Sequence, residues 1–211
     1  MRLTDFDTLT FDCYGTLVDW ETGIFDGLRP LLAKVNRDLT RDDVLEVHAL
    51  HESFQQKYTP AKRYQELLPV VYKRLAEEWQ VPLTLEEYVI YGKSVKNWPA
   101  SPDSAEVLKY LKQDYKLVIL SNIDDERFNF SHAKLAVEFD AIITAEDVGA
   151  YKPSARNFEY MLRSWSALAC RGARFCIRPR VCFTITNRRI HSASNRVGSI
   201  VATLRMASVR R

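Results

Sequence analysis

A short stretch near the start of the chain constrains the fold more than any other. In residues 9–19, a β-rich run ends on the carboxylate of Asp12 and is followed by a turn at Gly15. Open α/β sheets place their chemistry at the carboxyl ends of buried strands. The stretch therefore predicts the first strand of such a sheet, with Asp12 at the edge where a functional site would lie.

The following part of the chain alternates between apolar runs and helical patterns. Residues 116–121 are almost continuously apolar, which is typical of a parallel strand that is covered on both faces. Further strands are predicted at residues 7–13 and 139–144. Four helical patterns fill the interval from about residue 20 to 98. We predict a doubly wound, Rossmann-like parallel sheet with an inserted helical cap domain.

Capping residues and prolines set the expected limits of the helices. Thr40 and Thr84 each begin a helix of the insertion, and Pro99 ends the last of them. Ser101, which is followed by proline, begins the next helix. The last helix is expected over residues 154–162. These limits follow from local signals alone and can each be compared with the structure.

The net charge of +3 conceals an uneven distribution along the chain. All 27 acidic residues lie at or before Glu159, whereas the 11 basic residues from Arg163 onward are all arginines. A basic tail can bind nucleic acid, but this one is interleaved with Phe, Cys, Ile, Val and Trp and lacks lysine. We therefore expect no nucleic-acid partner and favour a tail that is read out of frame.

These observations divide the chain into three parts. We expect residues 1–19 and 99–162 to form the α/β core and residues 20–98 to form the helical cap. Residues 163–211 are expected to form an aberrant basic tail that is disordered or out of frame. No apolar run is long enough to span a bilayer, and the polar start has no signal-peptide pattern. With no convincing disulfide framework among the four cysteines, we expect a cytoplasmic protein without a membrane partner.

Three groups of polar residues follow predicted strands or precede helices. They are Asp12 with Thr16, Ser121 with Asn122, and Lys152 in a loop. A carboxylate nucleophile must be ionised, desolvated and correctly aimed. Lys152 would supply a positive charge beside Asp12, while Ser121 and Asn122 offer neutral donors for an acid group of a substrate. Thr16 would help to orient the carboxylate.

In this order, the three groups resemble three of the four motifs of the haloacid dehalogenase superfamily. The motif Phe-Asp-x-Tyr-Gly-Thr-Leu around Asp12 resembles the first motif of the 2-haloacid dehalogenase branch of this superfamily. The resemblance implies that Asp12 attacks the halogen-bearing carbon of a small anionic substrate, a 2-halocarboxylic acid, and that water cleaves the resulting ester. It implies catalytic roles for Lys152 and Thr16, and substrate contacts by Tyr14, Ser121, Asn122 and Arg41. It also implies a homodimer, no metal and no other cofactor.

Two alternatives stay open. A phosphatase of the same superfamily would need Mg²⁺ and usually carries a second Asp two residues after the nucleophile, where this chain has Tyr14. A catalytically inactive binding protein is the other alternative. The fourth motif of the superfamily supplies an acidic residue after Lys152, but no Asp or Glu follows Glu159. The sequence therefore predicts that any activity of this chain is impaired.

Overall fold

The core of the protein is a four-stranded parallel sheet with the order β3-β2-β1-β4. The structure is a computed structural model, which describes residues 6–169 and 183–185. The strands are β1 (Thr8–Phe11), β2 (Lys116–Ser121), β3 (Ala141–Thr144) and β4 (Phe183–Ile185). In the register of the sheet, Leu9 of β1 lies between Leu117 of β2 and Phe183 of β4. Residues 116–121 thus form a strand with the limits expected from their apolar run.

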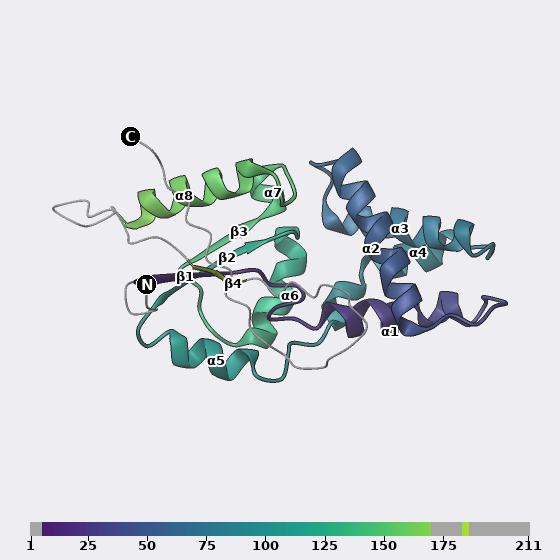
Figure 1. Cartoon of the computed structure of the whole chain (residues 1–211), viewed down its shortest axis with the longest axis horizontal. Coiled ribbons are helices and arrows are strands. Elements are labelled where there is room, and N and C mark those ends of the chain that lie inside the picture. The colour runs from purple at the N-terminus through teal and green to yellow at the C-terminus, as the bar shows by residue number, and fades with distance from the viewer. Residues whose placement is uncertain (1–5, 170–182, 186–211) are drawn as a thin grey trace.

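Helices cover both faces of this sheet, as Figure 1 shows. They are α5 (Ser104–Leu111) and α6 (Asp125–Leu135) on one face, and α7 (Ala145–Val148) and α8 (Ala155–Ala169) on the other. Neighbouring side chains of a strand point to opposite faces. Accordingly, Leu117 joins a buried cluster with Phe128 of α6, whereas Val118 joins a second cluster with Trp165 of α8. The predicted doubly wound arrangement is confirmed.

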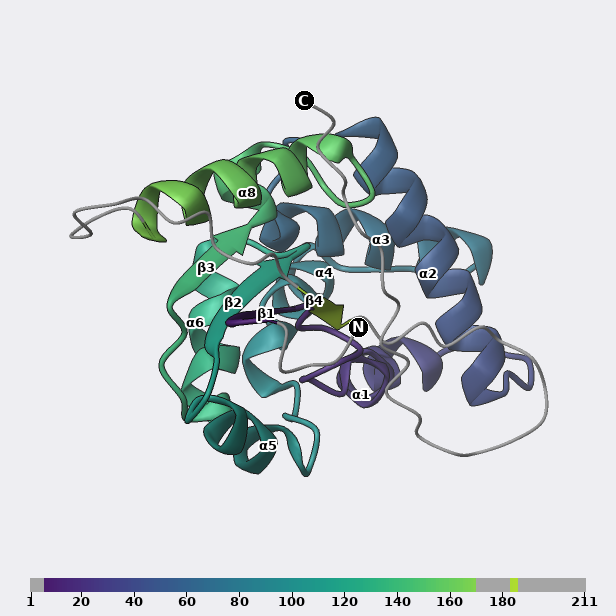
Figure 2. The same ribbon diagram turned by 60° about the vertical axis from the view of Figure 1, so that its left-hand side comes forward.

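A group of helices is inserted between β1 and β2 and forms the cap. They are α1 (Trp20–Leu32), α2 (Arg41–Tyr58), α3 (Tyr64–Glu78), α4 (Leu85–Gly92) and the 3-10 helix η2 (Ser94–Asn97). Figure 1 shows these helices beyond one end of the sheet, and the rotated view in Figure 2 shows α2 alongside α3. The inserted cap is therefore confirmed as part of the fold, while its limits at residues 20 and 98 stay predictions.

Several helix limits differ from those expected. The capping box at Thr40 is present, with its side chain accepting from the N–H of Asp43 at 3.2 Å. The last α-helix of the cap ends at Gly92 and not at Pro99, because glycine is a poor helix former and commonly ends helices. The chain then continues as η2.

Two further limits were wrong for tertiary reasons. Ser101 does not begin a helix, because residues 99–101 are extended and pair with the turn after β1: the N–H of Ser101 donates to the carbonyl of Leu17 at 2.9 Å, and Ala100 forms a β-bridge with Val18. Helix α5 starts only at Ser104. The last helix runs past Leu162 to Ala169, and Trp165 within this extension is buried against the sheet. Within the described residues, none of the helices has the length and apolar character needed to cross a membrane.

Candidate active site

A tight turn after β1 holds Asp12 at the carboxyl end of the strand. The carbonyl of Cys13 accepts from the N–H groups of Leu17 and Val18, at 2.7 and 3.0 Å. Gly15 adopts a φ of 85°, a conformation that favours glycine. A Cβ at this position would also lie 2.5 Å from the indole nitrogen of Trp20. Glycine is therefore needed for the turn that presents the Asp12 carboxylate.

The Asp12 carboxylate lies beside the ammonium group of Lys152. Lys152 Nζ is 2.9 Å from Asp12 Oδ1, and the N–H of Cys13 donates to the same oxygen at 2.8 Å. The ammonium group also donates to the carbonyl of Leu120, the penultimate residue of β2, at 2.6 Å. The Asp12 side chain is 25 % exposed to solvent and the Lys152 side chain 15 %, so a small molecule can reach both.

Asn122 ties the loop after β2 to the loop that carries Lys152. Its side-chain oxygen accepts from the N–H of Lys152 at 2.6 Å, and its amide group donates to the carbonyl of Lys152 at 3.1 Å. The neighbouring Ser121 is buried, and its hydroxyl finds no hydrogen-bond partner among the described residues. Asn122 therefore fixes the position of Lys152, while Ser121 retains the capacity for a further hydrogen bond.

Tyr14 follows Asp12 by two residues, but its hydroxyl bonds to a helix of the core. Tyr14 Oη and Ser131 Oγ of α6 are 2.8 Å apart. The tyrosine ring lies edge-on to Trp98, with 5.6 Å between the ring centroids. Burial raises the pKa of Tyr14 well above its usual value, so the hydroxyl stays protonated at neutral pH. Tyr14 thus lines the region near Asp12 and is held there by α6.

Thr16 and Arg41 are placed differently. Thr16 lies in the same turn as Asp12, where its N–H donates to the carbonyl of Cys13 at 3.3 Å. Arg41 is exposed at the start of α2, donates to Thr22 at 2.9 Å, and lies over the ring of Phe25 at 5.5 Å. Both contacts are with α1. They lend no support to substrate binding by Arg41, which stays a prediction.

Asp124 and Tyr151 also lie near the site, although no sequence motif predicted them as site residues. Each lies close in sequence to a predicted site residue, Asp124 after Asn122 and Tyr151 before Lys152, and each bonds to the cap. The only local signal was the position of Asp124 immediately before a helical pattern. Its bond to the cap joins residues 59 positions apart, which no local pattern reveals.

The described residues offer no evident metal centre. Within residues 6–169 and 183–185, no group of three or more His, Cys, Asp or Glu side chains is arranged to hold a metal ion. Residues beyond Ile185, where the sequence lacks the expected acidic residue, lie outside the described part of the chain.

Comparison with known proteins identifies the family of the chain. The family of haloacid dehalogenase-like hydrolases matches residues 6–167. The chain belongs to this family of hydrolases. A comparison with curated proteins gives no match.

Solved structures show the same fold at low sequence identity. The L-2-haloacid dehalogenase PA0810 has a TM-score of 0.64 and 19 % identity, over 76 % of this chain and 71 % of that one. The L-2-haloacid dehalogenase of Xanthobacter autotrophicus with chloropropionic acid covalently bound has a TM-score of 0.63 and 16 % identity, over 75 % of this chain and 64 % of that one. The HAD hydrolase YfnB from Bacillus subtilis, bound to magnesium, has a TM-score of 0.60 and 19 % identity, over 75 % of this chain and 73 % of that one. At these identities the likeness concerns the fold alone.

Proposed function

We propose that this hydrolase cleaves the carbon–halogen bond of a small 2-halocarboxylic acid through an ester on Asp12. The observation that carries the proposal is the close pair of Asp12 and Lys152 at the carboxyl end of β1, with 2.9 Å between Oδ1 and Nζ. A carboxylate that is ionised and aimed by fixed donors is the requirement for nucleophilic displacement at carbon. The resemblance of the motif around Asp12 to that of 2-haloacid dehalogenases supports the same reaction, displacement of a halide by the carboxylate.

The first step of the proposed reaction forms the ester. An oxygen of Asp12 attacks the carbon that bears the halogen, and the halide leaves with the bonding electron pair. The two contacts to Asp12 described above both engage Oδ1. Since the ammonium group of Lys152 and the N–H of Cys13 both hold Oδ1, we assign Oδ2 as the attacking atom. Oδ1 then stays bonded to Lys152 and to the N–H of Cys13 as the carbonyl oxygen of the ester.

The second step regenerates the enzyme. Water adds to the carbonyl carbon of the Asp12 ester, the bond from that carbon to the ester oxygen breaks, and the product leaves as a 2-hydroxy acid. Lys152 and the N–H of Cys13 stabilise the negative charge that develops on Oδ1 during this addition. The water gives up two protons: one passes to the leaving oxygen of the hydroxy acid and one is released, so substrate and water give the hydroxy acid, halide and a proton.

Neutral donors near this pair would bind the acid group of the substrate. The buried Ser121 hydroxyl has an unused hydrogen-bonding capacity among the described residues, as expected of a group that awaits a ligand. Asn122, Tyr14 and Thr16 complete the proposed group, with Arg41 as its least supported member. We propose that no metal or other cofactor takes part.

The position of Tyr14 favours a dehalogenase over a phosphatase. The general acid of the superfamily's phosphatases usually lies two residues after the nucleophile. Here that position holds a tyrosine whose hydroxyl bonds to Ser131 at 2.8 Å and whose pKa is raised by burial. Such a group is a poor proton donor to a leaving alcohol at neutral pH.

The remaining proposals concern the setting of the reaction. We propose a cytoplasmic enzyme that acts on a small anionic molecule, without nucleic-acid or membrane partners, and that forms a homodimer. Because the sequence lacks an acidic residue after Glu159, we expect slow turnover of the ester. The out-of-frame origin of the tail stays a prediction, which translation of the gene in its other two frames would test.

The proposal is tested by measuring product release from the purified full chain. We expect halide release from 2-chloropropionate that is unchanged by a chelator, and no phosphate release from p-nitrophenyl phosphate. Asp12→Asn serves as the inactive control. Phosphate release that requires magnesium would replace the dehalogenase proposal with the phosphatase alternative. If neither product forms, the dehalogenase proposal fails and the inactive binding protein is the alternative that remains.

A further inference from the structure

A short segment of the cap, residues 62–65, makes three polar contacts with the core. The N–H of Gln65 donates to Asp124 Oδ2 at 2.8 Å, and the hydroxyl of Tyr151 donates to the carbonyl of Lys62 at 2.6 Å. The guanidinium group of Arg63 lies 2.7 Å from Glu146. We call residues 62–65 the docking segment. Its three partners all belong to loops or helix starts at the carboxyl end of the sheet.

Asp124 serves two helices at once. It is the N-cap of α6, where Oδ1 accepts from the N–H of Arg127 at 2.9 Å. Its other oxygen accepts from Gln65, in the first turn of α3. The N-cap of α3 itself, Arg63, makes no side-chain capping bond. Because the N–H groups of a first helical turn have no partner within the helix, a carboxylate of the core completes a helix of the cap.

Burial makes this contact specific. Asp124 is buried, with an exposed fraction of only 1 %. A buried carboxylate is costly unless it is fully bonded, and the positive ends of two helix dipoles favour its charge. If the cap moved away from the core, Asp124 would lose one of these partners, and α3 would lose its cap. The hydrogen-bonding needs of Asp124 and of the first turn of α3 therefore both favour the arrangement in which the cap contacts the core.

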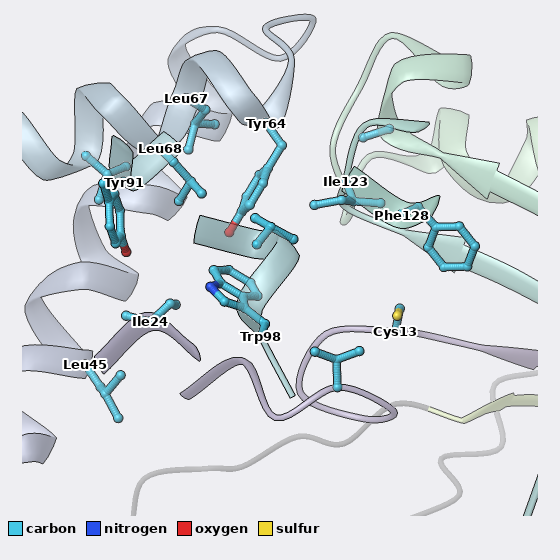
Figure 3. Packing of buried hydrophobic residues seen from close by; sticks show 14 of the residues in the cluster. Cys13, Ile24, Leu45, Tyr64, Leu67, Leu68, Tyr91, Trp98, Ile123 and Phe128 are labelled. Atoms are coloured by element: carbon cyan, nitrogen blue, oxygen red, sulfur yellow. The ribbon is translucent and has the colours of Figure 1, made fainter. Parts of the chain in front are cut away.

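Tyr151 provides the second link. It is buried, and burial raises the pKa of its hydroxyl above its usual value, so it remains a hydrogen-bond donor to Lys62. Apolar packing lies close by. Figure 3 shows the hydroxyl end of Tyr64, the first residue of α3, directed toward Trp98, and the centroids of the two rings lie 6.3 Å apart. Cap and core thus share one buried cluster next to the docking segment.

These contacts involve the loops that carry the proposed site. Asp124 lies two residues after Asn122, and Tyr151 directly precedes Lys152. Asn122 in turn binds both backbone groups of Lys152. We infer that Asp124 and Tyr151 are positioning residues, which dock the segment 62–65 onto both loops and so couple the seating of the cap to the position of Lys152. The kinetic part of this inference rests on the proposed function.

The docking itself can be tested without a substrate, by amide hydrogen exchange at Gln65. Asp124→Asn keeps the shape of the side chain but leaves one oxygen for two donors. We expect exchange at the Gln65 amide to become at least about fivefold faster. The matched control is Asp43→Asn, since Asp43 is exposed and bonds to Thr40 within the cap only. This control leaves Gln65 unaffected. Exchange at Gln65 equal to that of wild type, or acceleration spread evenly over β2 and α3, would overturn the inference.

Coupling to the site is tested with Tyr151→Phe. This change removes the bond to Lys62 and keeps the ring, so we expect kcat for halide release to fall about tenfold with little change in KM. Tyr88→Phe, on α4 of the cap, is the control and should leave kcat unchanged. An unchanged kcat in Tyr151→Phe would contradict the coupling. A wild-type chain that releases no halide would instead overturn the proposed function, while the exchange result at Gln65 would still decide the docking.

Discussion

The core and the cap each contain a close pair of an acidic and a basic side chain, with different surroundings. In the core, Asp12 and Lys152 approach to 2.9 Å, remain partly exposed, and bond to backbone groups at strand ends. In the cap, His48 Nδ1 lies 3.6 Å from Glu52, and the imidazole has no exposed area. Both members of the core pair are partly exposed to solvent, whereas the basic member of the cap pair, His48, is fully buried.

The surroundings of the cap pair favour its neutral form. Burial, and then the charge of His51, lowers the pKa of His48 to about 3. Glu52 keeps 17 % of its side-chain exposure, but burial of its carboxyl still raises its pKa to about 7, although a bond from Tyr64 opposes this shift. The hydroxyl of Tyr91 lies 2.8 Å from the remaining nitrogen of His48. Similar residue types therefore form the proposed reactive site in one region and a buried hydrogen-bonded group in the other.

The largest expected effect is that of Asp12→Asn. An amide is a very weak nucleophile, so halide release should fall at least about a thousandfold. The free energy of unfolding should change little, because the side chain keeps its shape. The control is Asp26→Asn, since Asp26 is exposed and pairs only with Arg29 on α1. Equal activity in wild type and Asp12→Asn would show that the core pair is structural, like that of the cap.

Lys152→Met should have the next largest effect. It removes the charge beside Asp12 and the donor to the carbonyl of Leu120, and we expect kcat to fall by about 10²–10³. Lys73→Met is the matched control, because Lys73 lies on the surface of α3 and pairs with Glu77 at 3.8 Å. A loss of activity that is equal in both variants would argue against a special role for Lys152.

A third change should affect packing of the cap more than chemistry. A Cβ on Gly23 of α1 would lie 2.3 Å from the ring of the buried Trp98. Gly23→Ala should therefore lower the free energy of unfolding by about 1–3 kcal/mol, measured by urea denaturation. Gly149→Ala is the comparison, because its Cβ meets no atom and costs only the strain of a φ of 67°, about 1 kcal/mol. The reverse order of stability would contradict this packing.

The smallest expected effect is the pH dependence of the cap pair. His48 loses a proton on folding, so its contribution to stability falls as pH drops from its ordinary pKa of 6.5 toward 3. Glu52 retains a proton on folding, so its contribution falls as pH rises from 4.5 toward 7. In wild type the two contributions to the free energy of unfolding change in opposite directions where these ranges overlap, from pH 4.5 to 6.5.

Removing one member of the pair should expose the slope of the other. In Glu52→Gln, the free energy of unfolding should rise between pH 4.5 and 6.5, by at most about 1.4 kcal/mol per pH unit relative to wild type. In His48→Gln it should fall over the same range. Urea denaturation at several pH values measures both. Parallel profiles in all three proteins would mean that the cap pair is not neutralised by burial.

Local sequence signals predicted the limits of a strand or helix well where those limits depend only on residues within that strand or helix. The apolar run ending at Ser121 needs two covered faces, and Thr40 with Asp43 forms its capping box from neighbouring residues. Prediction failed where distant segments compete. Ser101 bonds to the turn after β1 in place of beginning a helix, and Trp165 extends α8 because the sheet covers it.

The candidate site was predictable only in part, for the same physical reason. Asp12, Asn122 and Lys152 follow or precede regular elements, and the carboxyl ends of parallel strands necessarily meet. In contrast, the bonds of Tyr14 to Ser131 and of Asp124 to Gln65 join residues 117 and 59 positions apart. The first contact depends on how α6 packs against the turn after β1 and the second on how the cap packs against the core, so no local sequence pattern predicts either of them.

The ester on Asp12 is the central claim, and an isotope measurement tests it most directly. One turnover of 2-chloropropionate is carried out in water labelled with heavy oxygen, with enzyme in excess. If water cleaves the ester at the aspartyl carbonyl, the label appears in the peptide containing Asp12, and the first product carries unlabelled oxygen. Label in the first product, with none in that peptide, would mean that water attacks the substrate directly and would contradict the account.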